Sequence, residues 1–152
     1  MSSQPTALAG KLLQLLGFFH RGSLDVPEGL FARGCVLRMN GLAYEDTLGR
    51  PASDPLTRLL GRGPAAYRFV AQGLRYAVPD LTIQLDELQG EERAGLVTAV
   101  AMLSGTPRGA GAESLRATAD VALVTDGQGL VSEVGVQVTE DLLRTLAAAR
   151  RA

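Results

Sequence analysis

Residues 115–138 read LRATADVALVTDGQGLVSEVGVQV, and this stretch decides the fold. Two runs of alternating side-chain polarity flank the segment Asp126-Gly-Gln-Gly129. Alternation with a period of two is typical of β-strands, and glycines beside an aspartate are typical of a tight turn. The stretch therefore predicts a β-hairpin. A two-residue turn at Gly127 and Gln128 would place Asp120 opposite Gly135.

The two faces of this hairpin differ in polarity. One face is almost wholly apolar, so we expect it to lie either in the core under the helices or in a dimer interface. The other face carries polar groups in the middle of long strands, which is typical of a pocket lining. We expect the polar members of that face to form the binding site: Arg116, Thr118, Asp120, Glu133 and Gln137. The alternative is a solvated sheet surface on which Arg116 pairs with Glu133.

The segments before the hairpin alternate between helical and strand patterns. Apolar spacing predicts a helix over 6–20 and a second helix that starts at Pro64 and stops before Pro79. We expect strands over 35–39, 82–86 and 96–104, the last covered on both faces, and a helical turn near Pro27. Asn40-Gly41 favours a hairpin turn, and Thr139 is a suitable cap for a last helix. This order predicts an α+β fold with the helices packed on one face of an antiparallel sheet.

The bulk composition narrows the class of protein. A length of 152 residues predicts one domain that covers 1–152. The net charge of −1 argues against a nucleic-acid partner, and no apolar run is long enough to span a membrane. The single cysteine, Cys35, favours the cytoplasm. With His20 as the only histidine, we expect neither a metal site nor a cofactor. His20 should cap a helix end or lie in solvent.

Several short stretches, in this order, carry a resemblance to a known family. They are Gly61-Arg-Gly-Pro-Ala65, Val78-Pro-Asp-Leu81, Ser104-Gly-Thr-Pro-Arg-Gly109, Asp126-Gly127 with Leu130-Val-Ser-Glu133, and Thr139-Glu-Asp-Leu-Leu143. The chain resembles the nuclear-transport-factor-2-like (NTF2-like) superfamily and, within it, the SnoaL-like branch related to polyketide cyclases. The resemblance implies a cone of N-terminal helices packed on a strongly curved antiparallel sheet, with a C-terminal helix. It also implies a cavity at the wide end and a homodimer through the outer sheet face.

The resemblance breaks down at the catalytic positions. Cyclases of this branch use a carboxylate near the end of the last strand and a histidine on the preceding strand. Those positions correspond here to Gly135 and Asp120, while Val134 replaces the tryptophan and Pro107 the histidine of a "GTH" turn. The standard cyclase residues are therefore not matched, and whether the chain is an enzyme stays open.

Three functions remain at this point. The first is a protein that binds a small apolar or carbonyl-bearing molecule in a cone-shaped pocket, with Tyr67 among the binding residues. The second is an acid/base enzyme of the cyclase, isomerase or hydratase type, which uses Asp120 or Glu133 as the acid/base, with Asp120 as the catalytic candidate. Against this stands the alternative that Asp120 only pairs with Arg116 or another arginine. The third is a dimeric association module without catalysis.

Overall fold

The computed structural model describes residues 7–22, 29–44, 61–109 and 113–151. Its elements, in chain order, are α1 (Ala7–His20), β1 (Phe31–Met39), β2 (Leu42–Ala43), α3 (Gly63–Ala77), β3 (Thr82–Glu91), the 3-10 turn η2 (Glu92–Ala94), β4 (Leu96–Gly105), β5 (Leu115–Thr125), β6 (Val131–Gln137) and α4 (Glu140–Arg151). This arrangement confirms the predicted α+β class. The helical turn expected near Pro27 and most of the loop after Gly41 lie outside the described residues.

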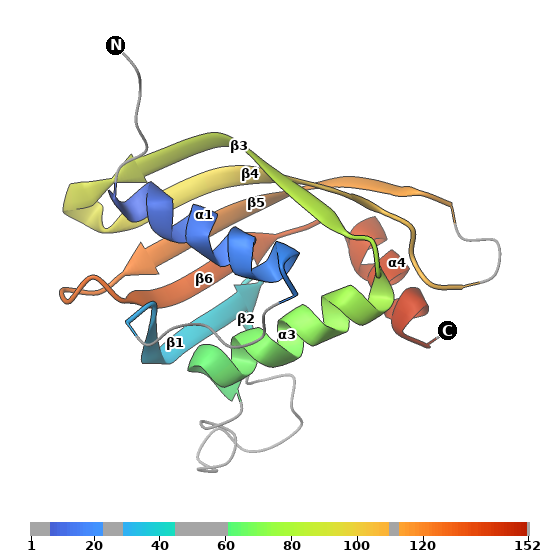
Figure 1. Ribbon diagram of the computed structural model, residues 1–152, viewed down its shortest axis with the longest axis horizontal. Coiled ribbons are helices and arrows are strands. Elements are labelled where there is room, and N and C mark those ends of the chain that lie inside the picture. Colours follow the sequence, from blue (N-terminus) through green and yellow to red (C-terminus); the bar gives the residue numbers. More distant parts are fainter. Residues whose placement is uncertain (1–6, 23–28, 45–60, 110–112, 152) are drawn as a thin grey trace.

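The described strands form one six-stranded sheet in the order β2-β1-β6-β5-β4-β3 (Figure 1). Neighbouring strands are antiparallel except β1 and β6, which run parallel and pair Phe31 with Val131 and Met39 with Val136. The expectation of a wholly antiparallel sheet is therefore wrong at this one junction. The pairing joins segments about a hundred residues apart, which no local pattern reveals.

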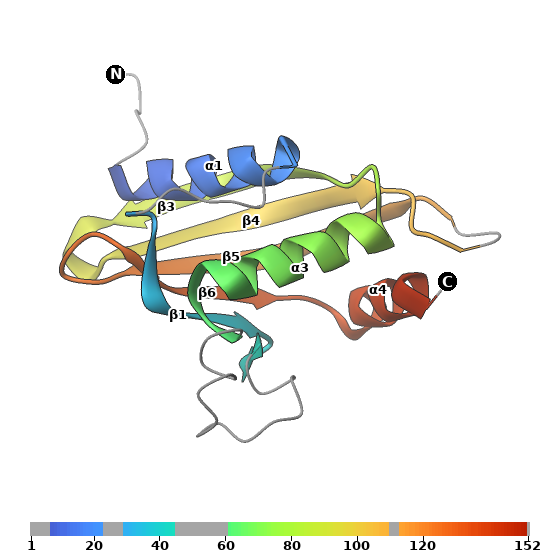
Figure 2. The same ribbon diagram turned by 60° about the horizontal axis from the view of Figure 1, so that its bottom comes forward.

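Helices α1 and α3 lie on the same face of the sheet (Figures 1 and 2). α1 packs on β3 and β4, whereas α3 packs on β1 and, at its other end, on α4. No described helix covers the opposite face, which we call the outer face. The expectation that β4 is covered on both faces is wrong, because its outward-facing Met102 is 41% exposed.

The apolar face predicted for the hairpin is the core. Leu123 on β5 is fully buried, and Ala119 and Val134 are nearly so, against the helices. The alternative that this face is a dimer interface is therefore wrong. Core packing extends over the inner faces of the neighbouring strands through Val97 and Ala99 of β4.

The turn of the hairpin is one residue longer than predicted. Asp126 N donates to Leu130 O at 2.8 Å, and Gly129 has a φ of +79°, so three residues form the loop. A β-bulge at Ser132, between the pairs Thr125–Val131 and Val124–Glu133, adds a second residue, so Asp120 pairs with Gln137 rather than Gly135. The difference is two residues, and a shift by an even number leaves every side chain on its predicted face.

Helix α3 begins where the chain approaches β1 most closely. Gly63 has a φ of +65°, and a Cβ built there would lie 2.7 Å from Arg33 O. Only glycine satisfies both conditions, because it has no Cβ and tolerates positive φ. Pro64 then favours the first turn, as predicted.

The far end of α3 is fixed by Arg75. Its guanidinium donates to Phe19 O at 3.0 Å, to Leu81 O at 3.1 Å and to Pro79 O at 3.2 Å. It also stacks 4.4 Å from the centre of the Phe19 ring. These contacts join the end of α1, the end of α3 and the start of β3. His20 Nε2 reinforces the junction, since it accepts a hydrogen bond from Ile83 N at 3.1 Å.

We predict that Gly63→Ala lowers the free energy of unfolding by about 2 kcal/mol or more, because the new Cβ meets the β1 backbone at a strained φ. Urea denaturation would measure the change. Gly10→Ala in α1 is the matched control, since its added Cβ meets no atom within 4 Å. The control should gain about 0.5–1 kcal/mol. Equal stability of the two variants would contradict this account of the junction between α3 and β1.

Candidate functional site

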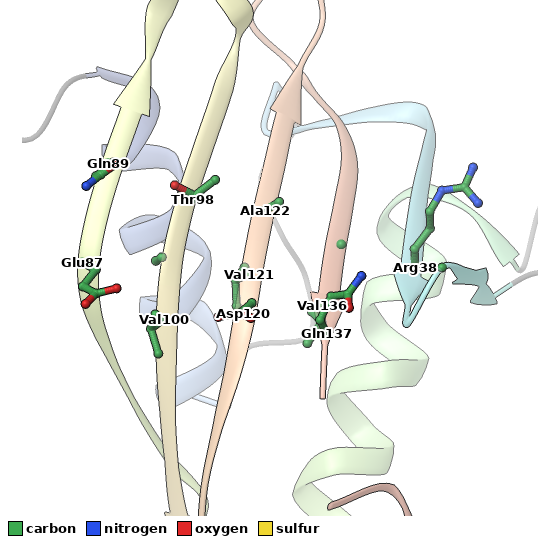
Figure 3. Close-up of a pocket in the computed structure, with 13 residues that line it drawn as sticks. Arg38, Glu87, Gln89, Thr98, Val100, Asp120, Val121, Ala122, Val136 and Gln137 are labelled. Carbon is green, nitrogen blue, oxygen red and sulfur yellow. The ribbon is translucent and has the colours of Figure 1, made fainter. Parts of the chain in front are cut away.

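A depression of about 430 Å³ crosses the outer face of the sheet (Figure 3). Its floor is apolar at Val100 and Ala122, and its polar side chains come from five different strands. These polar residues are Arg38, Glu87, Gln89, Thr98, Asp120 and Gln137. The volume lies within the range of small-molecule sites, but the depression is open because Asp120 and Gln137 are exposed.

A β-bulge turns one of these side chains toward the depression. The pairing of β3 with β4 shifts between Asp86 and Gln89, and Glu87 has a φ of +53°. Asp86 Oδ1 accepts a hydrogen bond from Glu87 N at 2.9 Å, which holds the backbone in this uncommon conformation. Glu87 and Asp120 lie on either side of Val100, so two carboxylates face one apolar floor (Figure 3).

Arg38 forms the other margin of the depression. Its Nε donates to Glu133 Oε1 at 2.5 Å, across the parallel junction of β1 and β6. Glu133 therefore pairs with Arg38, and the alternative pairing with Arg116 is wrong. Both side chains are partly exposed, so the pair contributes at most about 1 kcal/mol to stability.

The six predicted site residues do not come together. Five share the outer face, as the alternation predicted, but only Asp120 and Gln137 line the depression. Arg116 and Thr118 line a second hollow, between β5 and α4. Within the described part of the chain no arginine pairs with Asp120.

The sixth residue, Tyr67, lies on the inner side of the sheet. It belongs to α3, is 8% exposed, and its ring lies 5.7 Å from that of Phe31. Its hydroxyl is buried and has no hydrogen-bond partner among the residues that the structure describes. Burial raises the pKa of Tyr67, and the Arg75 charge opposes this only in part. The hydroxyl therefore stays protonated and is available as a donor.

The surroundings of Tyr67 are apolar. Among the described residues that are buried, only Tyr67 and Cys35 carry polar side-chain atoms. Several apolar side chains next to this core are only partly buried: Leu15, Phe18, Leu37, Leu74 and Val121. Among the described residues, the inner side of the sheet thus has partly exposed apolar side chains and one buried hydroxyl, that of Tyr67, without a hydrogen-bond partner.

Cys35 is the other polar atom of the interior. Its side chain is fully buried in β1. Burial, with a smaller contribution from the Glu133 carboxylate, raises the pKa of the Cys35 thiol from 9.0 to about 12. A neutral thiol is a poor nucleophile, so Cys35 is a packing residue.

The described residues contain neither a cluster of metal-ligating side chains nor a membrane-spanning helix. No three of their His, Cys, Asp and Glu side chains gather as a metal site would require. None of the helices in the described ranges is long and apolar enough to cross a membrane.

Comparison with known proteins gives the fold but no function. No protein-family model and no curated protein sequence matches the chain. Among solved structures, a candidate SnoaL-like polyketide cyclase from a Jannaschia species matches with a TM-score of 0.67 and 15% identity, over 100% of this chain and 97% of that one. IdmH, a candidate polyketide cyclase from Streptomyces antibioticus, matches with a TM-score of 0.64 and 18% identity, over 96% and 99%. The chain therefore has the α+β cone of the NTF2-like fold.

A third match shows that similarity to this fold does not by itself indicate a shared activity. A de novo designed protein with a curved β-sheet matches with a TM-score of 0.64 and 10% identity, over 99% of this chain and 98% of the design. The design is as similar in shape as the natural proteins are. A function for this chain must therefore be argued from its own residues.

We predict that stability falls at alkaline pH through Cys35. Because the folded state raises the Cys35 pKa, the unfolded chain releases this proton first. The contribution of Cys35 is therefore complete below pH 9.0 and is lost as the pH rises toward about 12. Urea unfolding at a series of pH values should show a shallower decline for Cys35→Ala than for the wild type. Identical slopes would contradict the raised pKa.

Proposed function

We propose that the chain binds a small, mostly apolar molecule that bears a hydrogen-bond acceptor such as a carbonyl, on the inner side of the sheet beside Tyr67. The observation that carries the proposal is the buried Tyr67 hydroxyl, which lacks a partner among the described residues. The likeness to polyketide cyclases, whose substrates are rich in carbonyl groups, agrees with such a ligand.

The energetics of an unpaired hydroxyl support this ligand class. Leaving a buried hydroxyl without a partner costs about 1–3 kcal/mol, and phenylalanine would fill the same space without that cost. A carbonyl of the ligand would accept the Tyr67 hydrogen bond and remove the penalty only in the bound state. The half-buried Phe18, Leu37 and Val121 would bury further apolar surface against the body of the ligand.

The same residues favour binding over catalysis. No carboxylate or imidazole occurs among the buried side chains in the described ranges, so proton transfer has no acid or base beside Tyr67. Asp120 faces the outer side of the sheet, away from Tyr67. We therefore place ligand recognition, and not turnover, at the inner side.

We predict that Tyr67→Phe weakens binding of the fluorescent ketone prodan about fivefold and leaves the free energy of unfolding unchanged or raised. The blue shift of prodan emission in an apolar site measures binding directly, and urea denaturation measures stability. Tyr76→Phe is the matched control, because Tyr76 lies on the same helix but is 46% exposed.

A carbonyl-free analogue, 2-dimethylaminonaphthalene, checks the role of the acceptor. It should bind the wild type and Tyr67→Phe equally. The proposal fails if Tyr67→Phe binds prodan as tightly as the wild type does, or if prodan does not bind at all.

A second candidate function, as a homodimeric module, rests on the outer face. No described element covers this face, and its centre carries small or apolar groups at Val100, Ala122 and Gly135. A second copy packed there would bury these groups and close the depression around Asp120. The dimer and the inner ligand site use opposite faces of the sheet, so both functions are compatible.

We predict that Ala122→Arg converts a dimer to a monomer without loss of fold, because the new side chain projects from the outer face. Light scattering coupled to gel filtration would report the mass, and circular dichroism the fold. Val121→Asp is unsuitable for this purpose, since Val121 faces the core and the charge would unfold the chain. A monomeric wild type, or a dimeric Ala122→Arg, would refute the interface.

A further inference from the structure

Strand β5 is longer than its neighbour β6. The pairing between them extends from Asp120 to Thr125, whereas β4 pairs with β5 from Leu115 onward. Leu115–Ala119 therefore has a strand partner on one side only. Every second residue of such a segment directs its N–H and C=O away from the ladder. No described backbone or side-chain group hydrogen-bonds to that free edge.

A groove of about 1240 Å³ lies along this free edge. Helix α4 forms the opposite wall, since it lies beyond the end of β6 and alongside β5 (Figure 2). The groove also extends over the neighbouring strands. Its sheet wall consists of Leu115, Arg116, Ala117 and Thr118 of β5, Met102, Leu103 and Ser104 of β4 and Gln84 of β3, and its helix wall includes Asp141, Leu142, Thr145, Ala148 and Ala149. An extended peptide of about five residues spans roughly 17 Å, which matches the length of the free edge.

The opposite margin of the sheet shows how this chain protects an edge. On β3, the outermost strand, His20 Nε2 accepts a hydrogen bond from Ile83 N at 3.1 Å, and α1 packs on the same strand. Unprotected edges are sites of pairing with another chain, and proteins normally block them. The edge of Leu115–Ala119 has no such cap within the described residues.

We propose that this groove binds an extended segment of a partner protein, which adds to the sheet as a strand along Leu115–Ala119. The backbone of the peptide would satisfy the free N–H and C=O groups of β5. Successive side chains of the peptide would face opposite sides of the sheet. The groove would therefore select a peptide whose side-chain polarity alternates from one residue to the next.

The chemistry of the two sides defines the partner segment. The inner side of the groove is apolar, with Leu103, Leu115 and Leu142. The outer side carries Arg116, which has no ion pair or hydrogen bond with any described residue. Glu113 and Asp141 also line the groove, but neither forms an ion pair with Arg116, and Asp141 pairs instead with Arg144 at 2.7 Å. The complementary peptide therefore alternates aliphatic and acidic residues.

A second copy of this chain fits the groove less well than a peptide. In each copy the edge of β5 faces α4 across the groove, so two such edges cannot approach each other to the spacing of about 4.8 Å that strand pairing requires. An isolated extended segment has no such obstruction.

Fluorescence anisotropy with a short labelled peptide of alternating valine and glutamate tests the proposal on the full-length protein. Wild type should bind it, and hydrogen exchange should slow within Leu115–Ala119 on binding. Arg116→Glu should weaken binding at least about fivefold. Arg93→Glu, the same charge change in the η2 turn that precedes β4, should leave binding unchanged.

A peptide of the same sequence with N-methylated amides separates strand addition from simple charge attraction, because it cannot complete the ladder. It should not bind. The proposal is overturned if no peptide binds, if the methylated peptide binds equally, or if exchange within Leu115–Ala119 is unaffected. Slow exchange there that depends on protein concentration alone would identify a second copy as the occupant instead.

Discussion

The position of the helices on the sheet depends on one side chain, Arg75. Its guanidinium binds carbonyls from two segments, the end of α1 at Phe19 and the α3–β3 connection at Pro79 and Leu81, and stacks on the Phe19 ring. Phe19 O lies in the last turn of α1, where carbonyls have no partner within the helix, so this bond ties the end of α1 to the end of α3. Because α3 is held here at one end and at Gly63 at the other, its orientation is defined. Tyr67 consequently faces the interior.

Local patterns predicted much of the fold. The bounds of α3 followed from Gly63-Pro64 and Pro79, and the alternation over 115–138 sorted the side chains of β5 and β6 onto the correct faces. The register of the hairpin did not follow, because the sequence allows both a two-residue and a three-residue loop and gives no sign of the β-bulge beside Thr125. The parallel pairing of β1 with β6 was also missed, since it depends on tertiary contacts between distant segments.

The candidate site was predicted less completely than the fold. Alternation grouped Arg116, Thr118 and Asp120 on one face, but it could not say that the helices cover the other face. Arg38 was not anticipated because its partner, Glu133, lies 95 residues away. The unpaired state of the Tyr67 hydroxyl emerges only once the whole interior is assembled. Neither feature has a signal in a single sequence.

The parallel junction of β1 and β6 has a consequence for the order of folding. Phe31 pairs with Val131, so the first strand to be synthesised completes its pairing only after the last strand has left the ribosome. Contacts of such long sequence separation slow folding, because the intervening loop must close before they form. Until β6 is available, β1 has no hydrogen-bonded partner strand on the side that β6 occupies in the folded protein, and its core residues Phe31 and Cys35 stay uncovered there. A nascent chain of this protein would therefore be most vulnerable to aggregation late in translation, and chaperones that shield N-terminal strands would have the largest effect there.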